Sequence, residues 1–270
     1  RAIDIVGTGG DKSNTVNVST MSALVVAAAG VPVCKHGNRA ASSKCGAADL
    51  LEAAGVAIEL DPHGVEASIA ATGFGFCLAA HFHPAFRYTG PSRREIGIPT
   101  VFNLLGPMAN PAPISNMLVG VAMPNMMEAM VGALASRNVT SAWVVHGHGG
   151  LDELAVSGPN IVYELRDGNI SRFEIDAAEF GITHSTLADI RGGDATDNLA
   201  IMNGLFSGQT GAVRDIVTFN AGCALFVARH VESVADGIDV ARATIDSGAA
   251  ASMLAKVVTV SSAEAKRMQV

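Results

Sequence analysis

The strongest constraint on the fold is an alternation of two kinds of segment over the first 150 residues. Short β-branched runs typical of strands alternate with alanine-rich stretches typical of helices. Strands are expected at Ile3–Val6, Val31–Lys35, Val56–Leu60, Phe74–Leu78, Leu118–Ala122 and Ala142–His146, and helices at Thr20–Ala29, Ala47–Ala54, Val65–Ala71 and Asn125–Ser136. The strands are nearly all apolar, as in a sheet covered on both faces. The alternation predicts an α/β fold with a central, largely parallel sheet flanked by helices.

Residues 84–113 interrupt this alternation and are rich in proline. We expect this segment to leave the large α/β domain and join a small helical domain. Residues 1–83 and 114–270 then form the two parts of the large domain. A hairpin is expected between Ala155 and Glu174 with its turn at Asp167–Asn169, followed by helices at Asp197–Phe206, Ala212–Ala228 and Ser233–Ile245. The last ten or so residues show no clear pattern.

Composition argues against two classes of protein. The net charge of −7 and the 5% aromatic content disfavour a nucleic-acid binder, which usually has a basic face and stacking residues. No apolar run reaches the length of a membrane span, and no signal peptide is visible. The four cysteines are scattered and form no CxxC pair, which is typical of reduced thiols in a cytosolic protein. We therefore expect a cytoplasmic location.

The first candidate site follows the first predicted strand. Gly7-Thr8-Gly9-Gly10-Asp11 allows positive φ angles and exposes backbone N–H groups to a ligand. Asn17-Val18-Ser19-Thr20 then gives good N-cap chemistry for a helix whose free N–H groups would favour an anion. The alternative is a tight strand–helix turn with an ordinary cap. The spacing fits neither a dinucleotide fingerprint nor a Walker A loop.

A second donor-rich loop, Lys35 to Ser43, follows the second predicted strand. It places two cations and two hydroxyls at a strand end, where ligands bind in doubly wound sheets. Lys35 and Arg39 suit phosphate oxygens, and Ser42 and Ser43 can donate to the same groups. The alternative is a solvated loop with incidental charges.

A third candidate, Asp152-Glu153, follows a glycine-rich turn after the strand that ends at His146. Adjacent carboxylates can present several oxygens to Mg²⁺, which typically takes one or two carboxylates together with phosphates. The alternative is an ordinary surface pair. The doublets His81-x-His83 and His146-x-His148 suggest Zn²⁺, but they lack a third ligand at characteristic spacing.

Six motifs in order resemble the anthranilate phosphoribosyltransferase family. They are Gly7-Thr8-Gly9-Gly10-Asp11, Asn17-Val18-Ser19-Thr20, Lys35 to Ser43, Arg93-Arg94-Glu95-Ile96-Gly97, Phe102-Asn103-Leu104-Leu105-Gly106-Pro107 and Leu151-Asp152-Glu153-Leu154. The resemblance implies a small helical domain over a large α/β domain, with the active site between them. It implies transfer of the phosphoribosyl group of phosphoribosyl diphosphate to the amine of anthranilate, in tryptophan biosynthesis, by a homodimer.

The resemblance also implies roles for particular residues. Mg²⁺, as two ions, would be bound by Ser19, Asp152 and Glu153. Anthranilate would meet Gly7, Asn38 and Arg93, with His36 and His83 nearby. Phosphoribosyl diphosphate would be surrounded by Gly7, Gly10, Asp11, Thr15, Asn17, Val18, Ser19, Thr20, Lys35, His36, Gly37, Asn38, Arg39, Ala40, Ala41, Ser42, Ser43 and Ala47. No residue is assigned as a general base, because the aromatic amine is neutral and already nucleophilic.

Three departures from the family pattern stand beside these motifs. Lys12 and Ser13 occupy a position where a smaller, glycine-like pair is expected, and Lys44-Cys45 replaces a stretch of small residues. The family also carries helices before the first glycine loop, so the small domain is expected to be incomplete in this chain. Two rival functions are a pyrimidine nucleoside phosphorylase and a non-enzymatic nucleic-acid-binding relative of the same fold. The phosphorylase has a lysine-serine-glycine-rich loop that Lys35-His36-Gly37-Asn38 does not match. The nucleic-acid-binding relative predicts a basic groove, whereas this chain is acidic.

Overall fold

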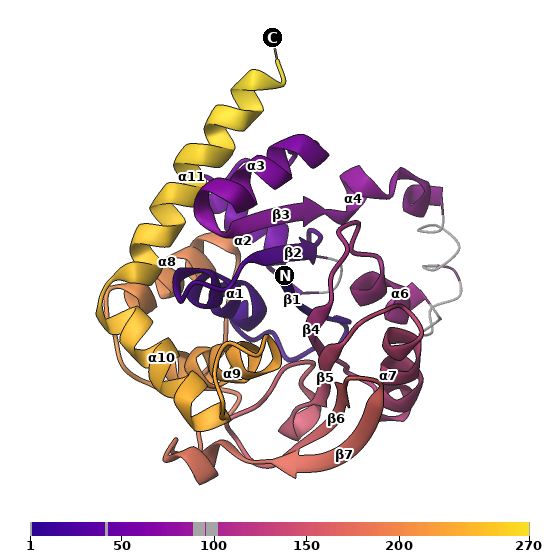
Figure 1. Ribbon diagram of the computed structural model, residues 1–270. Helices are drawn as coiled ribbons and strands as arrows, with labels where there is room; N and C mark the ends of the chain where they lie inside the picture. The colour runs from indigo at the N-terminus through magenta and orange to yellow at the C-terminus, as the bar shows by residue number, and fades with distance from the viewer. Residues whose placement is uncertain (1, 41–42, 89–94, 96–101, 270) are drawn as a thin grey trace.

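Seven strands form one mixed sheet in the order β3-β2-β1-β4-β5-β6-β7 (Figure 1). This computed structural model describes residues 2–40, 43–88, 95 and 102–269. The first five strands run parallel and the last two form an antiparallel hairpin against β5. Their bounds are β1 Ile3–Gly7, β2 Val33–Gly37, β3 Phe74–Leu78, β4 Asn116–Gly120, β5 Ser141–His146, β6 Asn160–Arg166 and β7 Asn169–Ile175. The predicted α/β class and the largely parallel sheet are confirmed.

Helices cover both faces of this sheet (Figure 1). Their bounds are α1 Val18–Ala28, α2 Ala47–Ala53, α3 Pro62–Thr72, α4 Ala79–Phe82, α6 Phe102–Met108, α7 Met127–Ala135, α8 Ala195–Phe206, α9 Ala212–Val227, α10 Val234–Asp246 and α11 Ala249–Arg267. Helices α1, α9, α10 and α11 join the largest apolar cluster, against inward residues such as Ile5 and Leu118. Helix α7 packs with the alternate residues Met117 and Val119 on the opposite face. This alternation along β4 is what a sheet buried on both sides requires.

One predicted strand, Val56–Leu60, is wrong. This segment is extended but lies outside the sheet and connects α2 to α3. The backbone N–H of Ala57 donates to Ser261 Oγ of α11, while Val56 and Ile58 are buried in the core. Its apolar residues therefore reflect burial in the core, and not pairing with another strand.

The predicted hairpin and the three helices after it are confirmed, and α11 is not among the predicted helices. The domain boundaries stay a prediction, because residues 89–94 and 96–101 of the expected excursion lie outside the described residues. None of the described helices is both long enough and apolar enough to cross a membrane.

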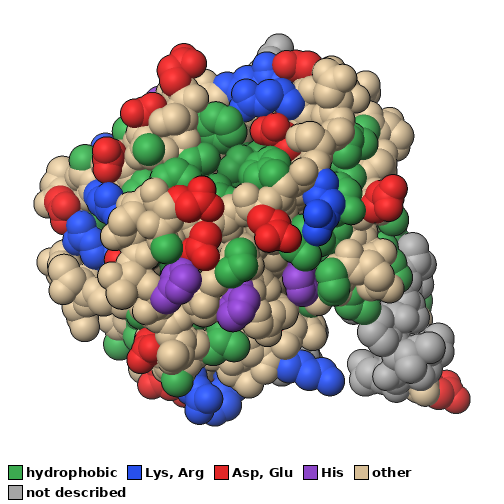
Figure 2. Space-filling model, turned by 90° about the horizontal axis from the view of Figure 1, so that it is seen from below, with side chains coloured by type: hydrophobic (Ala, Val, Ile, Leu, Met, Phe, Trp, Pro, Cys, Tyr) green, Lys and Arg blue, Asp and Glu red, His purple; other side chains and the backbone are tan. Residues whose placement is uncertain are grey.

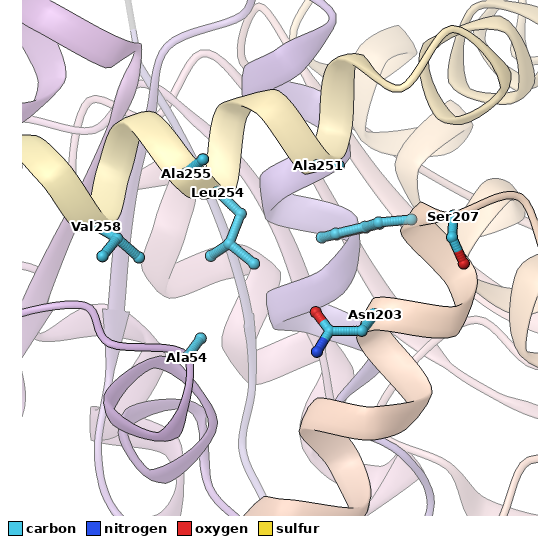
Figure 3. A pocket seen from close by; sticks show the side chains of 8 residues that line it. Ala54, Asn203, Ser207, Ala251, Leu254, Ala255 and Val258 are labelled. Atoms are coloured by element: carbon cyan, nitrogen blue, oxygen red, sulfur yellow. The ribbon is translucent and has the colours of Figure 1, made fainter.

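A shallow apolar groove of about 440 Å³ separates α8 from α11, with Leu254 and Asn203 facing each other across it (Figure 3). No predicted site residue lines this groove.

Helices α9 and α10 approach each other through two glycines. A Cβ at Gly237 would lie 2.3 Å from the carbonyl oxygen of Gly222, and a Cβ at Gly222 would lie 2.7 Å from the backbone nitrogen of Ile238. Real Cβ atoms do not approach backbone so closely, so neither position accepts a side chain without moving a helix.

We predict that Gly237→Ala destabilises the protein by about 1–3 kcal/mol, because the added methyl overpacks the α9–α10 contact. The matched control is Gly132→Ala in the exposed interior of α7, where an added Cβ has nothing within 4 Å. That change should stabilise the protein by about 0.5–1 kcal/mol through helix propensity. Chemical denaturation measures both. Equal stabilisation by the two variants would contradict the close packing of α9 and α10.

Candidate functional site

The segment Leu151–Ala155 lies across the carboxyl ends of three parallel strands, each of which ends at or just before a glycine. A Cβ at Gly120 would lie 1.5 Å from the carbonyl oxygen of Asp152, and one at Gly147 would lie 2.1 Å from that of Glu153. A Cβ at Gly7 would lie 2.3 Å from Asp152 Oδ2. Only glycine permits this approach, so these three positions determine where Asp152 and Glu153 lie.

Both carboxylates contact the first predicted loop. Asp152 Oδ2 accepts a hydrogen bond from the backbone N–H of Gly9 at 2.6 Å, and Glu153 Oε1 accepts one from that of Ser19 at 3.1 Å. Ser19 lies in the first turn of α1, where backbone N–H groups lack intrahelical partners and the helix dipole favours negative charge. The sequence motifs of residues 7–20 and 151–154 are therefore brought together.

Neither carboxylate is fully stabilised as an anion. Burial, and then the nearby Asp11 carboxylate, raises the pKa of Asp152 to about 7. Burial, and then Asp152 and Asp11, raises the pKa of Glu153 well above its ordinary value. Two partly buried carboxyl groups with like-charged neighbours form a site that a cation would stabilise.

Lys35 lies beneath these carboxylates. Its side chain is buried, and Nζ donates to the carbonyl oxygen of Ile5 at 2.6 Å and to Ser19 Oγ at 3.2 Å. Burial lowers the pKa of Lys35, while Asp4, Glu153 and Asp152 oppose that effect. Lys35, which the sequence predicts to bind phosphate, is thus already hydrogen-bonded within the protein, beside the carboxylates.

The glycine loop adopts the positive φ angles that its glycines allow. Gly9 and Gly10 have φ angles of 69° and 86°, and Lys12 and Asn14 have φ angles of 59° and 53°. A positive φ at Lys12 agrees with the expectation of a glycine-like residue there. The Asp11 carboxylate accepts hydrogen bonds from the backbone N–H and the Oγ of Ser13.

The start of α1 is capped as predicted. Asn17 Oδ1 accepts from the backbone N–H of Thr20 at 3.2 Å, and the N–H of Asn17 donates to Asn198 Oδ1 at 2.9 Å. Thr15 forms an isolated bridge with Arg191. Val18 and Thr20 are fully buried, so they lie beneath the surface that a ligand would meet.

The second loop holds its arginine in an ion pair. Arg39 donates to both carboxylate oxygens of Glu52, at 2.6 and 2.9 Å, and to Asp49 at 3.4 Å. The backbone N–H groups of Ala40 and Gly46 donate to Asp49 Oδ2. Gly37 and Ala47 are partly buried, whereas Asn38 and Ser43 are exposed. Ala41 and Ser42 lie outside the described residues.

Two histidines contact the proline-rich segment near its end. The His36 Nδ1 atom lies 3.1 Å from the carbonyl oxygen of Gly106, and His83 Nε2 bonds the carbonyl oxygen of Ala109. The two imidazole rings meet edge to face with centroids 5.5 Å apart. Burial, and then His83, lowers the pKa of His36 to about 4, so His36 is neutral. Arg93, the predicted anthranilate ligand, lies outside the described residues.

The comparisons with known proteins agree on one family. A family model described as the glycosyl transferase family, a/b domain, matches residues 1–251. The anthranilate phosphoribosyltransferase of Rhodococcus jostii (strain RHA1) is 50% identical over 260 residues, covering 94% of this chain and 72% of that protein. The crystal structure of anthranilate phosphoribosyltransferase from Thermus thermophilus matches with a TM-score of 0.91 and 41% identity, covering 96% of this chain and 78% of that one. The chain belongs to the anthranilate phosphoribosyltransferase family.

Two structures of the Saccharomyces cerevisiae member of this family extend the comparison. One is in complex with PRPP and Mg, with a TM-score of 0.90 and 29% identity, and covers 97% of this chain and 74% of that one. The other, in complex with 4-fluoroanthranilate, has a TM-score of 0.89 and 27% identity with the same coverage. The family resemblance expected from the sequence is confirmed, and it favours this family over the two rival functions.

The charge distribution gives no support to nucleic-acid binding either. On the face seen in Figure 2, the described Lys and Arg side chains are spread among acidic and histidine side chains and form no continuous basic band. The described side chains on this face therefore provide no continuous basic surface of the kind that attracts phosphate backbones.

The histidine doublets do not form a zinc site in the part of the chain that the structure describes. Those residues contain no group of three or more His, Cys, Asp or Glu side chains that could hold a metal ion. His146 and His148 instead bond the carbonyl oxygen of Val121 and the hydroxyl of Ser157. Asp152 and Glu153 still suit Mg²⁺, because this ion completes its shell with water and phosphate oxygens.

Three polar residues that support the site were not predicted from the sequence, namely Asp4, Asn110 and Asn198. Asp4 accepts from the backbone N–H of His36 and from Asn110 Nδ2, so it joins β1, β2 and the returning chain. Burial raises the pKa of Asp4 to about 6. Asn198 supports Asn17 from α8. The one available signal for Asp4 was that it is a charged residue inside an apolar strand. Asn110 and Asn198 gave no such signal, because their partners are distant in sequence.

The raised pKa of Asp152 predicts how stability depends on pH without metal or substrate. The folded state favours the protonated form, so the free energy of unfolding should fall as pH rises from the ordinary value of 3.8 through about 7. Asp152→Asn keeps the shape and the acceptor for Gly9 but removes the charge. Its stability advantage over the wild type should grow by on the order of 2 kcal/mol between about pH 5 and about pH 8.

Urea denaturation with a chelator present, at both pH values, measures this difference. A wild type and a variant that change in parallel with pH would show that Asp152 ionises as readily in the folded chain as in the unfolded one.

Proposed function

We propose that this chain transfers the phosphoribosyl group of phosphoribosyl diphosphate to the amine of anthranilate, with release of diphosphate, as a Mg²⁺-dependent enzyme of tryptophan biosynthesis. The observation that carries the proposal is the placement of Asp152 and Glu153 against Gly9 and the first turn of α1. The yeast structures, which are complexes with PRPP and Mg and with 4-fluoroanthranilate, support the choice of ligands.

In this proposal the diphosphate binds between the first glycine loop and the loop after β2. Backbone N–H groups near Gly10 would provide donors without a net charge. The amino end of α1 would contribute the positive end of its helix dipole, since the N–H groups of Ser19 and Thr20 are already bonded within the protein. Arg39 would have to exchange Glu52 for a phosphate, since both use the same guanidinium donors. Lys35, already bonded to Ser19, contributes positive charge from below the cleft.

Asp152 and Glu153, with Ser19, are the residues that would hold Mg²⁺, and we propose two ions at this site. When bound, Mg²⁺ would neutralise charge that accumulates on the departing diphosphate. The raised pKa values of both carboxyl groups support a site that is stabilised by cations.

Anthranilate is assigned to Gly7 and Asn38, and to Arg93, which lies outside the described residues. A guanidinium matches the anthranilate carboxylate with two hydrogen bonds, which supports the assignment of Arg93. The neutral His36 and the neighbouring His83 contact Gly106 and Ala109, near the end of the proline-rich segment. The amine needs no general base, so these residues orient it above the ribose carbon and supply proximity.

The organisation of the whole protein is part of the same proposal. Residues 84–113 would contribute to a small helical domain above the cleft, with residues 1–83 and 114–270 forming the large domain. We also propose a homodimer, which the family resemblance supports, and a cytoplasmic location, which the free cysteines support.

The proposal is tested by the loss of anthranilate fluorescence with phosphoribosyl diphosphate and Mg²⁺. In the double variant Asp152→Asn, Glu153→Gln, the Mg²⁺ concentration for half-maximal rate should rise by about tenfold or more and kcat should fall, because anionic oxygen ligands are lost. The KM for anthranilate should stay near the wild-type value. Glu66→Gln, which removes an exposed carboxylate of α3, is the control and should behave as the wild type.

Superimposable Mg²⁺ titrations of the double variant and the wild type would show that Asp152 and Glu153 are an ordinary surface pair. No fluorescence loss with any form of the protein would contradict the proposed reaction itself.

A further inference from the structure

Asn220 is a buried amide in the middle of the apolar helix α9. It is 3% exposed, and Ile216, Val217, Phe219 and Ala221 around it are completely buried. Its side chain bonds the backbone of Leu154, which is 66 residues away in the sequence. Oδ1 accepts from the N–H of Leu154 at 3.1 Å, and Nδ2 donates to the carbonyl oxygen of Leu154 at 2.8 Å and to that of Ile216 at 2.9 Å.

Leu154 directly follows the carboxylate pair, so Asn220 acts on the backbone that carries Glu153. The two hydrogen bonds to one residue fix both the position and the orientation of its backbone, as neighbouring strands do in a sheet. An apolar side chain at this position would suit the burial of α9. It would leave the N–H and the carbonyl of Leu154 without these partners.

The rest of the segment is held in the same way. Gly120 and Gly147 leave room for the carbonyl groups of Asp152 and Glu153, and the N–H of Gly147 donates to the carbonyl oxygen of Leu151 at 2.8 Å. Beyond Leu154, Asn160 Oδ1 accepts from the N–H of Ala155 at 2.6 Å. The backbone is therefore constrained before, at and after the residue that Asn220 bonds, which leaves the carboxylates little freedom to adjust.

Helix α9 is well placed for this role. It packs against α1, whose first turn bonds Glu153, and against β4, whose last residue lies under Asp152. A shift of the Asn220 contact would change the distance between the two carboxylates and the amino end of α1. Residues that hold metal-binding side chains in position through hydrogen bonds, without contacting the metal, commonly control metal affinity.

We propose that Asn220 is a positioning residue for Asp152 and Glu153, and that it sets the affinity of this site for divalent cations. The inference rests on the proposed role of these two carboxylates in binding Mg²⁺. It adds a residue outside the motifs of the cleft, one that would touch neither substrate nor metal.

The test uses Mn²⁺ as the probe, with its binding to the full chain measured by electron paramagnetic resonance with and without phosphoribosyl diphosphate. Asn220→Ala should weaken Mn²⁺ binding by about 10- to 100-fold, the usual effect of losing such a support. Asn220→Asp keeps an acceptor for the N–H of Leu154 but loses the amide donor, so its Mn²⁺ affinity should be intermediate. The KM for anthranilate should not change in either variant.

Ser141→Ala is the control for general loosening of α9. It removes a buried hydrogen bond of 2.7 Å from Ser141 Oγ to the carbonyl oxygen of Val227, at the far end of the same helix. It should lower the melting temperature and leave Mn²⁺ affinity at the wild-type value. An equal loss of Mn²⁺ affinity in Ser141→Ala and in the Asn220 variants would overturn the proposal.

The double variant Asp152→Asn, Glu153→Gln distinguishes a failure of the proposed metal site from a failure of the positioning role of Asn220. If it binds Mn²⁺ weakly while Asn220→Ala and Asn220→Asp bind as the wild type does, the metal site stands and the positioning role of Asn220 is wrong. If the double variant itself binds Mn²⁺ as the wild type does, the metal assignment and the inference built on it both fail.

Discussion

The rest of the site depends on the close passage of residues 151–155 over the carboxyl ends of β1, β4 and β5. The absence of side chains at Gly7, Gly120 and Gly147 lets the backbone and the carboxylate of Asp152 lie directly on the sheet edge. From there the two carboxylates reach the N–H groups of Gly9 and Ser19. A parallel sheet brings its strand ends to one edge, and these glycines turn that edge into a surface where acidic groups and helix donors meet.

The electrostatics of this edge are unfavourable without a ligand. Burial raises the pKa values of Asp152 and Glu153 and lowers the pKa of Lys35, so neither sign of charge is well solvated. Under the proposed function, a divalent cation would stabilise the carboxylates, and diphosphate would meet Lys35 and the amino end of α1. Metal and substrate would then bind more tightly together than separately, because each supplies charge that the other needs.

The sequence predicts most of the sheet and the location of the site, since both follow from local pattern. Strand ends followed by glycines, hydroxyls and an Asp-Glu pair indicate one edge of the sheet, and the structure brings these residues together there. Local pattern cannot distinguish Val56–Leu60, an apolar segment beside α11, from an edge strand. Nor does it reveal that Arg39 bonds Glu52, or that Asn198 and Asn220 support residues 181 and 66 positions away. Those contacts arise only from tertiary packing. The roles of all the predicted site residues stay predictions, and Arg93, Ala41 and Ser42 lie outside the described residues.

The most direct measurement of the central claim is the anomalous diffraction of Mn²⁺ in crystals of this protein that also contain phosphoribosyl diphosphate. Mn²⁺ takes the oxygen ligands that suit Mg²⁺ and can be located by its scattering. We predict an anomalous peak within bonding distance of the Asp152 and Glu153 carboxylates and beside the diphosphate. Diphosphate bound between the two loops with no peak at these carboxylates, or a peak at His81 and His83 or at His146 and His148, would contradict the account.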